Sequence, residues 1–514
     1  MPKVNIKNKG LCINVEKGTT LVNAIRSVMS FETPCSEKGL CGKCKVKAKG
    51  ELSKVSNEEL DFIEDGERLS CIAKVLGDVE VEIIESSSNM KRKTSGITRE
   101  VDINNKYKGI GKYGVSIDIG TTGLSAYLIS LDTGEVLSKE SSINPQVEYG
   151  GDVLSRISYS TSCENGIENL KNSIVGGINS LIEKMAESIK TDLSNILKVT
   201  VSANNVMLHM LLGLDATPLS QSPYKPLFTN IKVLTLNDIA LNINENAEVI
   251  LLPSVSAYVG ADIVSGVVNC NLKKKKGKIV FIDIGTDGEI VISLNGKLYA
   301  TATAAGPAFE GMNISCGSRA IKGAIDSFYI KDNKVTFTTI ENSEAKSICG
   351  SGIMDIIGEF VKSNIIQKSG RINKKIENLD ILKIIDKKVE IANNIYITQE
   401  DIRNIQLAKG AIYTGFKMLL NKSGEKIENI DEFIIAGSFG YHLREDTLKT
   451  IGIIPNEFNG KVSFVGNVSL EGARLALIND NILDEMKSIK SEIVSIELSM
   501  EKEFEKEFVN NLRF

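Results

Sequence analysis

Residues 113–137 read YGVSIDIGTTGLSAYLISLDTGEVL, and residues 279–300 read IVFIDIGTDGEIVISLNGKLYA. In both copies an apolar run leads into Asp-Ile-Gly-Thr, and a glycine then opens a second apolar run that ends at a turn. Each copy is therefore predicted to form two antiparallel strands joined by a glycine turn. For a single copy, a simple hairpin would be the better interpretation. Two copies about 165 residues apart predict duplicated lobes whose glycine turns face each other across one cleft.

The two glycine turns have the composition of phosphate-binding loops. Glycine removes side-chain bulk, so backbone N–H groups and threonine hydroxyls can reach anionic oxygens. Asp118 and Asp283 end the first strand of each copy, where a carboxylate can hold Mg2+ through its waters. We therefore predict that Asp118 and Asp283 are catalytic. The predicted cofactor-binding residues of the two turns are Gly120, Thr121, Thr122, Gly285, Thr286, Asp287 and Gly288.

A third glycine turn follows an apolar strand in IDEFIIAGSFGYHL, residues 430–443. It is predicted to contact a nucleoside through Gly437, Ser438, Phe439 and Gly440. Two further stretches, CGSGIMDIIGEFV at 349–361 and FVGNVSLEGARLAL at 464–477, are predicted to begin helices, with small residues where helices cross closely.

These motifs together resemble the actin-like ATPase superfamily, which includes actin, the seventy-kilodalton heat-shock chaperones, and sugar and acetate kinases. The resemblance covers about residues 113–480. It implies that the two DIGT turns are phosphate loops and that the third turn is an adenosine loop. It also implies a duplicated RNase H-like α/β fold, with ATP and Mg2+ bound between the lobes.

The N-terminal region carries a cysteine cluster, CSEKGLCGKC at residues 35–44, followed by Cys71 in RLSCIAKV. Its spacing, C-x5-C-x2-C and a distant fourth cysteine, departs by one inserted residue from the plant-type [2Fe-2S] pattern. Structural zinc sites normally have two C-x2-C pairs, whereas this region has one, so zinc is the weaker alternative. We predict a [2Fe-2S] cluster bound by Cys35, Cys41, Cys44 and Cys71. Cys12 is interpreted as a core residue.

The sequence around the cluster predicts a β-grasp ferredoxin domain. VNIKNKGLCINV indicates two strands about a turn at Gly10, and TTLVNAIRSVM indicates a helix that starts at Thr19 or Thr20. The overall fold class is α+β multi-domain. The predicted units are 1–85 (ferredoxin), 86–112 (linker), 113–276 (first ATPase lobe) and 277–514 (second lobe). The linker is rich in Ser, Gly and Lys without apolar periodicity, and is predicted to be a flexible tether of about 27 residues.

Composition sets limits on partners and compartment. The formal net charge is −4 and charged residues make up 25%, which gives no signature of nucleic-acid or anionic-membrane binding. No long apolar run or leader pattern opens the chain, and nine cysteines favour metal binding over a disulfide framework. We expect a cytoplasmic protein and consider a homodimer plausible.

The fusion of these two parts is informative. An N-terminal [2Fe-2S] domain joined to an actin-like ATPase resembles the reductive activators of corrinoid-dependent proteins, and the resemblance covers nearly the whole chain. The supporting stretches are NPQVEYGGDVLSRISYS at 144–160, NNVMLHMLLGLDATPLSQSPYKPLF at 204–228 and AAGPAFEGMNISCG at 304–317. NNVMLHMLLG departs from the family's G-N-T-x-M-x-H form at Asn204 and Val206, so no ligand role is assigned to it.

The resemblance implies a function. The chain would use ATP to pass one electron from its cluster to the cob(II)alamin of a partner corrinoid protein, which restores cob(I)alamin for anaerobic methyl transfer. A low-potential electron donor would be the second partner. His209 and His442 lie outside the Asp-x-His-x-x-Gly pattern that binds a corrinoid, so the corrinoid is expected on the partner. Both histidines are interpreted as packed or surface residues, and Cys163, Cys270, Cys316 and Cys349 as core residues.

Two alternatives belong to other classes of protein. A sugar or acetate kinase with an appended redox sensor would share the cleft but would need a general base, for which Glu289 and Glu310 are candidates. A non-catalytic scaffold that binds ATP and partner proteins is the other.

Overall fold

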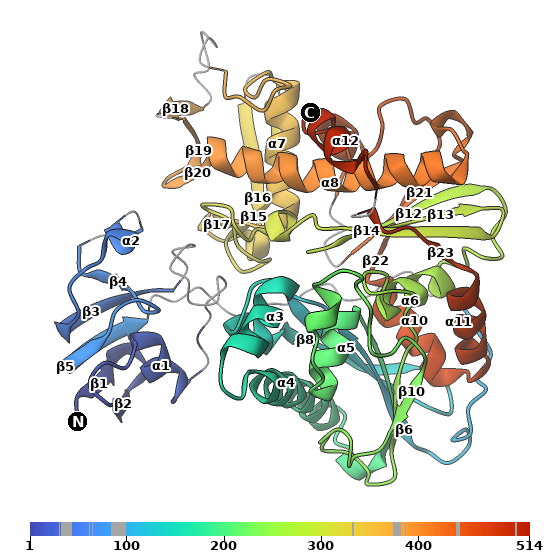
Figure 1. Cartoon of the computed structure of the whole chain (residues 1–514), viewed down its shortest axis with the longest axis horizontal. Helices are drawn as coiled ribbons and strands as arrows, with labels where there is room; N and C mark the ends of the chain where they lie inside the picture. Colours follow the sequence, from blue (N-terminus) through green and yellow to red (C-terminus); the bar gives the residue numbers. More distant parts are fainter. Residues whose placement is uncertain are drawn as a thin grey trace.

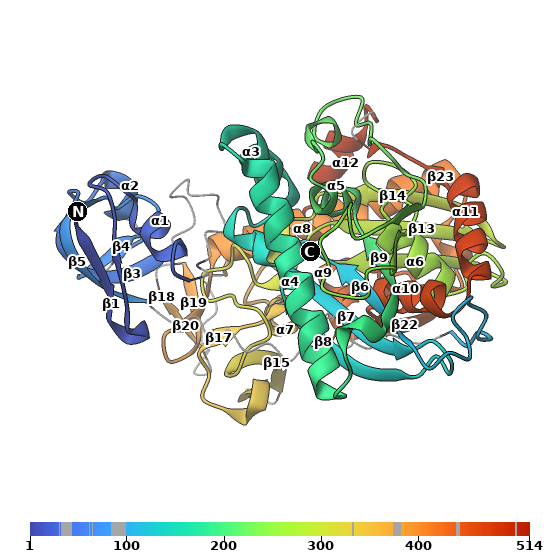
Figure 2. The same ribbon diagram turned by 90° about the horizontal axis from the view of Figure 1, so that it is seen from below.

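The computed structural model describes residues 1–29, 31, 44–60, 62–63, 65–83, 99–331, 334–373, 382–385, 387–437, 443–498 and 501–514. Cys35, Cys41, Ser438, Phe439, Gly440 and His442 lie outside these residues. Figures 1 and 2 show a small N-terminal domain beside two larger lobes stacked on each other. None of the helices in the described ranges combines the length and apolar character needed to cross a bilayer.

The N-terminal domain is a five-stranded sheet in the order β2-β1-β5-β3-β4. The predicted hairpin is present, because β1 pairs antiparallel with β2 around Gly10, whose φ is 64°. The predicted helix start is also confirmed, since the Thr20 hydroxyl accepts a hydrogen bond from the Asn23 N–H at 3.4 Å. The elements are β1 (Lys3–Ile6), β2 (Leu11–Asn14), α1 (Leu21–Arg26), β3 (Lys45–Leu52), α2 (Asn57–Leu60), β4 (Glu67–Leu69) and β5 (Val75–Ile83).

The first lobe is built on a six-stranded sheet in the order β10-β11-β9-β6-β7-β8. Its strands are β6 (Tyr113–Ile119), β7 (Gly123–Ser130), β8 (Val136–Ile143), β9 (Ile196–Ala203), β10 (Lys232–Leu234) and β11 (Glu248–Leu251). Its helices are α3 (Val153–Ser162), α4 (Gly166–Ser188), α5 (Asn205–Leu212) and α6 (Ala261–Asn269).

The second lobe repeats this plan in a sheet ordered β22-β21-β12-β13-β14-β23. Its strands are β12 (Lys278–Ile284), β13 (Gly288–Leu294), β14 (Lys297–Thr303), β21 (Glu432–Ala436), β22 (Lys461–Gly466) and β23 (Val494–Ser495). Two small sheets add β15 (Ala324–Lys331), β16 (Lys334–Thr339), β17 (Ser347–Ile348), β18 (Lys383–Ile385), β19 (Lys388–Ala392) and β20 (Ile395–Thr398). The helices are α7 (Gly350–Lys362), α8 (Gln399–Ser423), α9 (Glu445–Ile451), α10 (Val468–Ile478), α11 (Asn481–Glu492) and α12 (Phe504–Asn510).

The duplication predicted from the repeat is visible in the topology. In each lobe the DIGT strand pairs antiparallel with the strand that follows it, and parallel with a later strand on its other side. As a result Asp118 lies beside Ser202 of β9, and Asp283 lies beside Ala436 of β21. Both glycine turns thus emerge at the carboxyl ends of parallel strands, where open α/β sheets bind ligands.

Helix α10 comes from the C-terminal part of the chain but packs on the first-lobe sheet (Figure 1). Alternate residues of a strand point to opposite faces, so Tyr127 and Ile129 of β7 pack with Leu470 and Leu477 of α10. Leu124, on the other face, lies against Gly177 of α4. Both faces of the sheet are therefore covered at β7, which explains why this strand is buried along almost its whole length.

Residues 99–112 are packed rather than free, which corrects the prediction of flexibility for this part of the linker. Arg99 pairs with Glu485 at 2.9 Å, and Asn104 bridges to Asn479. The buried Asn105 amide donates to the Leu131 and Ile478 carbonyls at 2.9 and 3.3 Å. These partners satisfy polar groups of a segment that lacks apolar periodicity, so the predicted flexible tether does not include residues 99–112.

Small residues allow the predicted close crossing of helices. A Cβ atom at Gly472 of α10 would lie 2.4 Å from the Ser265 carbonyl oxygen of α6. A Cβ atom at Gly176, on the exposed face of α4, would meet nothing within 4 Å. Glycine is therefore required at the first position and is dispensable at the second.

We predict that Gly472→Ala lowers the apparent midpoint of thermal unfolding, because helices α6 and α10 must separate at a cost of about 1–3 kcal/mol. Gly176→Ala is the matched control. It should leave the midpoint unchanged or raise it, since alanine favours a helix over glycine by about 1 kcal/mol. Equal midpoints for the two variants, measured by circular dichroism, would contradict the close crossing.

Candidate functional site

The two glycine turns line one cleft between the lobes, together with Gly437 after β21. The predicted site residues found in its lining are Asp118, Gly120, Thr121, Thr122, Asp283, Gly285, Thr286, Asp287 and Gly437. Gly288 is buried at the start of β13 and lies behind this surface. A Cβ atom at Gly437, where φ is 115°, would lie 2.4 Å from the Ile284 carbonyl oxygen. Glycine at position 437 therefore lets the end of β21 approach the start of the second turn closely.

The two lobes meet at the tips of these turns. The hydroxyl oxygens of Thr122 and Thr286 are 3.1 Å apart. Both hydroxyls also donate to one carboxylate oxygen of Glu310, at 2.6 and 2.8 Å. Glu310 ends the short helix η5 (Pro307–Glu310) of the second lobe. This carboxylate, considered from the sequence only as a possible base, therefore joins the two predicted phosphate loops.

Asp118 is held in place by residues from the start of α10. Asn467 donates its side-chain N–H to one carboxylate oxygen of Asp118 at 2.7 Å, and the Ser469 hydroxyl donates to the other at 2.7 Å. Asn467 also caps α10, since its side-chain oxygen accepts from the Leu470 N–H at 2.9 Å. Neither Asn467 nor Ser469 was predicted from the sequence. The Asn-x-Ser pattern before an apolar helix predicts only that asparagine caps the helix, which is common in all proteins, and it does not predict a contact with Asp118.

Acidic groups crowd the floor of the cleft. Burial, with repulsion from Asp283 and Asp118, raises the pKa of Asp262 to about 8. Burial and Asp118 likewise raise the pKa of Asp283 to about 7. Burial raises the pKa of Asp287 to about 6, and that of Glu289 well above its usual value. A buried group of like charges must take up protons or a cation, so these residues could hold a divalent metal.

Asp262 was not predicted from the sequence. It lies in the first turn of α6, and no motif distinguishes its stretch, GADIVSG, from an ordinary acidic helix start. Asn204, for which the departure from the family motif left no assigned role, also lies in the cleft lining and donates to the Thr121 hydroxyl at 3.1 Å.

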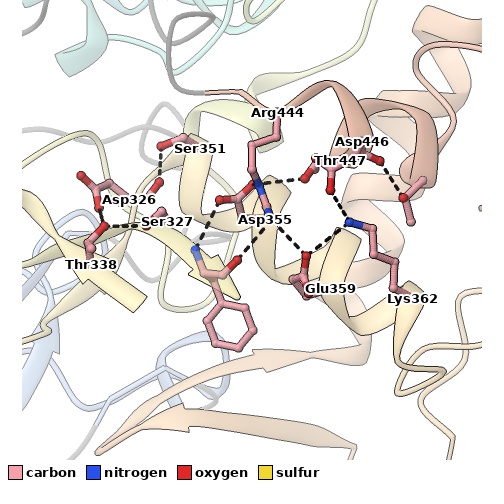
Figure 3. Close-up of polar contacts among 12 residues, drawn as sticks. Asp326, Ser327, Thr338, Ser351, Asp355, Glu359, Lys362, Arg444, Asp446 and Thr447 are labelled. Carbon is pink, nitrogen blue, oxygen red and sulfur yellow. Dashed lines mark hydrogen bonds and ion pairs between the residues drawn. The ribbon is translucent and has the colours of Figure 1, made fainter. Parts of the chain in front are cut away.

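A second polar network holds the chain just beyond the predicted adenosine loop. Figure 3 shows Arg444 between two acidic residues of α7, with its Nε donating to Asp355 at 2.8 Å and an Nη donating to Glu359 at 3.2 Å. The Arg444 guanidinium also lies 4.3 Å from the ring centroid of Tyr329 on β15. The Phe328 N–H donates to Asp355 at 3.3 Å, so the same network ties α7 to β15.

Helix α7 connects this network to the phosphate side of the cleft. A Cβ atom at Gly350, the first residue of α7, would lie 2.1 Å from the Phe309 carbonyl oxygen. The N-terminal end of α7 therefore lies against Phe309, the residue before Glu310. Asp355 and Glu359, further along the same helix, accept hydrogen bonds from Arg444. The acids at Asp355 and Glu359 lie on an otherwise apolar helical stretch, a signal that was present in the sequence.

Only half of the predicted cysteine site lies in the described residues. Cys44 and Cys71 are both buried, and their sulfur atoms are 3.2 Å apart. This separation exceeds the roughly 2.05 Å of a disulfide, and no described cysteine is disulfide-bonded. Val22 and Leu69 pack around the two thiols. Two adjacent thiols in a water-poor pocket fit ligands to an iron of a cluster. Cys12 is exposed, so its interpretation as a core residue is wrong.

The other cysteines and His209 vary in burial. Cys349 is buried, as expected, whereas Cys163 is exposed and Cys270 and Cys316 are partly exposed. His209 is buried, as predicted. Its Nδ1 lies 2.7 Å from the Asn205 carbonyl oxygen, and its Nε2 accepts from the Leu227 N–H at 3.1 Å. Both ring nitrogens are therefore used within the fold.

Comparison with known proteins accounts for this combination of domains. Residues 278–514 match the C-terminal (ASKHA) domain of RACo, residues 113–275 match the RACo middle region, and residues 4–76 match the 2Fe-2S iron-sulfur cluster binding domain. The chain is 30% identical to the corrinoid activation enzyme RamQ of Eubacterium limosum, over 80% of this chain and 71% of RamQ. The chain belongs to the RACo family.

Two further relatives support the family. The chain is 24% identical to the [Co(II) methylated amine-specific corrinoid protein] reductase of Methanosarcina barkeri, over 76% of this chain and 74% of that protein. The solved structure of a reductive activator for corrinoid, iron-sulfur protein superposes with a TM-score of 0.72 and 27% identity, covering 100% of this chain and 98% of that one. The RACo family confirms the predicted fold class and the predicted activity, ATP-dependent reductive activation of a corrinoid protein.

We predict that the apo protein loses stability as the pH rises. The unfolded chain releases the Asp283 and Asp262 protons near their usual pKa of 3.8, whereas the folded chain keeps them up to about pH 7 and 8. Stability therefore falls from about pH 4 until these groups titrate near pH 7 to 8, and then levels off. Thermal midpoints between pH 5 and 9 should fall by several degrees, and less steeply with Mg2+ present.

Asp283→Asn should flatten the same profile, because the amide does not titrate. Glu187→Gln, at the exposed C-terminal end of α4 and outside the cleft lining, is the control and should keep the wild-type slope. A wild-type midpoint that does not change between pH 5 and 8 would contradict proton uptake by the cleft.

Proposed function

We propose that this RACo-family chain binds Mg-ATP between the two glycine turns and passes one electron from a [2Fe-2S] cluster to the cob(II)alamin of a partner corrinoid protein. The product, cob(I)alamin, would be competent for methyl transfer. The observation that carries the proposal is the presence, in one chain, of a buried pair of adjacent thiols and a two-loop acidic cleft. The cluster would be held by Cys44 and Cys71 together with Cys35 and Cys41, and it would supply a one-electron carrier.

ATP is needed because the electron transfer is uphill. Plant-type clusters have potentials of about −400 mV, and the cobalt(II)/cobalt(I) couple of a corrinoid is expected to be lower. Each 100 mV costs roughly 2.3 kcal/mol for one electron. Nucleotide binding can offset this cost only by favouring a complex in which the cobalt's ligand environment has changed. The ATPase lobes would therefore act on the partner through their conformation.

The carboxylates of the cleft suit Mg2+. Asp118 is oriented by two hydrogen bonds, and Asp283 ends the equivalent strand of the other lobe. Mg2+ keeps several waters and is bound through one or two carboxylates and the nucleotide phosphates. We assign Asp118 and Asp283 to the waters of the metal, and the loop residues from Gly120 to Thr122 and Gly285 to Asp287 to the phosphates. The nucleoside would lie against Gly437 and the turn that follows it.

The corrinoid would be brought by the partner. His209 has both ring nitrogens engaged within its own lobe, which leaves this histidine no role as a cobalt ligand. The named targets of the relatives, among them a methylated amine-specific corrinoid protein, make a corrinoid protein of a methyl-transfer system the proposed partner. Cluster thiolates and a low-potential donor suit a reducing compartment, so we retain the cytoplasm as the proposed location. The homodimer remains a prediction.

A kinase function receives no support from the site. The Glu310 carboxylate accepts hydrogen bonds from both loop threonines, and Glu289 is buried with its pKa raised well above the usual value. Neither carboxylate is thus placed as a base facing an acceptor.

We predict that purified protein holds two irons and shows a [2Fe-2S] absorption spectrum that dithionite bleaches. Cys71→Ala should lose the iron, because it removes one of the adjacent thiols. Cys12→Ala is the matched control in the same domain and should keep the spectrum. Tightly bound zinc in place of iron, measured by plasma emission, would contradict the cluster assignment.

We predict that Asp283→Ala lowers ATP hydrolysis by at least about 100-fold, comparable to the loss of one electrostatic group in other active sites, while the cluster spectrum is unchanged. Reduction of cob(II)alamin on a purified corrinoid partner, followed by its absorbance, should fall in parallel. Glu344→Ala, in the loop before β17, is a control distant from the cleft lining. Cobalt reduction that survives the complete loss of ATP hydrolysis and binding would contradict the proposed coupling.

A further inference from the structure

One segment, residues 144–156, contacts both the first phosphate loop and the ferredoxin domain. It contains the short helix η2 (Pro145–Glu148) and the first turn of α3. Three of its polar side chains, those of Asn144, Gln146 and Arg156, are completely buried. Burial of a polar side chain is unfavourable unless it is hydrogen-bonded, so the partners of these three side chains show what the segment holds in place.

On the side that faces the cleft, residues of the segment donate hydrogen bonds to the carbonyl groups of the first phosphate loop. The Asn144 side chain donates to the Gly120 carbonyl at 2.8 Å, and the Asn144 N–H donates to the Thr122 carbonyl at 3.1 Å. The guanidinium of Arg156 donates to the Thr121 carbonyl between them. In a trans peptide the C=O and the next N–H point in opposite directions. Anchoring these carbonyls therefore turns the following N–H groups of the loop away from the segment, as anion binding requires.

Arg156 also closes the segment on itself. Its Nε donates to the Gly150 carbonyl at 2.9 Å, and an Nη donates to the Gln146 side chain at 3.3 Å. Burial lowers the pKa of Arg156 to about 9. One guanidinium thus donates hydrogen bonds both to the turn at residues 146–150 and to the phosphate loop. Movement of either one would break hydrogen bonds of Arg156.

At its outer side the same turn contacts the ferredoxin domain. Arg26, the last residue of α1, donates to the Glu148 carbonyl, and its guanidinium lies 5.7 Å from the ring centroid of Tyr149. The Arg26 Nε also donates to the Phe31 carbonyl of its own domain at 3.1 Å. The contact residue Tyr149 directly precedes Gly150, the acceptor of Arg156. In Figures 1 and 2, α1 lies on the side of its domain that faces the lobes.

We propose that residues 144–156 couple the first phosphate loop to docking of the ferredoxin domain, so that nucleotide binding and the Arg26 contact favour each other. The coupling rests on the proposed binding of ATP in the cleft. Its two states are a ferredoxin domain docked at Glu148 and Tyr149, and a ferredoxin domain whose contact through Arg26 is broken. The loop arrangement suited to phosphate is the one seen here with the domain docked, which gives the coupling a positive sign. Such coupling is reciprocal by thermodynamic necessity.

Arg26→Ala in the full-length holoprotein tests the proposal. Because the substitution removes the docking contact, we expect affinity for a non-hydrolysable Mg-ATP analogue to fall by about 5-fold or more, within the usual range of coupling between sites. Titration calorimetry measures the affinity. Lys7→Ala is the matched control, since Lys7 is a cation of the same domain that pairs with Glu80 of that domain. It should bind the analogue as the wild type does.

Small-angle X-ray scattering supplies a readout of docking itself. The analogue should reduce the radius of gyration of the wild type and of Tyr149→Phe, which keeps the ring, but not that of Arg26→Ala. Equal affinity of the wild type and Arg26→Ala for the analogue would overturn the coupling and leave the proposed function intact. Failure of every variant and of the wild type to bind the analogue would instead overturn the proposed function, and the coupling with it.

Discussion

Six carboxylates of the described residues line one cleft between two lobes, and the chain must offset their mutual repulsion. Burial raises the pKa of Asp262, Asp283, Asp287 and Glu289, and the fold adds hydrogen-bond donors from distant parts of the sequence to the other two acids. Thr122 and Thr286 of the two glycine turns donate hydrogen bonds to Glu310. Asn467 and Ser469 donate hydrogen bonds to Asp118. Within the part of the chain that the structure describes, Asp262, Asp283, Asp287 and Glu289 form no ion pair with a basic side chain. The guanidinium of Arg156 is turned toward backbone carbonyls. A bound metal nucleotide would thus complete an arrangement that the protein alone leaves unbalanced.

The same contacts make the state of the cleft dependent on both lobes. Glu310 belongs to the second lobe but accepts a hydrogen bond from the first, and Asp118 belongs to the first but is held by residues of α10. Separating the lobes would remove the Thr122 hydroxyl from the Glu310 carboxylate, and leaving a carboxylate without its donor is unfavourable. A ligand that replaces the donors would lower this cost. The lobes can therefore respond to a nucleotide without any change in their own folds.

The repeated Asp-Ile-Gly-Thr turns, the small residues of the helices and the cysteine spacing predict most of the architecture, because each depends on local chemistry. A single glycine turn after an apolar strand predicts only a hairpin, whereas two copies predict paired phosphate loops on duplicated lobes. Asp262 and Asn467 could not be found in this way, since an acid in a first helical turn and an asparagine cap are common in any helix. Their role follows from positions more than 140 residues from Asp118 along the chain. The packing of residues 99–112 was missed because its polar partners, among them Glu485 of α11 and the Leu131 carbonyl, are distant in the sequence.

The placement of α10 also has a consequence for synthesis of the protein. Strand β6 leaves the ribosome early, but α10, which covers one face of its sheet, and α11, which follows it, lie between residues 468 and 492. At about 5–20 residues per second, the chain needs on the order of 20–75 s to extend from β6 to the end of α11. During this interval Tyr127 and Ile129 lack the α10 side chains that bury them. The nascent first lobe therefore presents an apolar surface suited to a chaperone, and its half of the cleft is completed only near the end of translation.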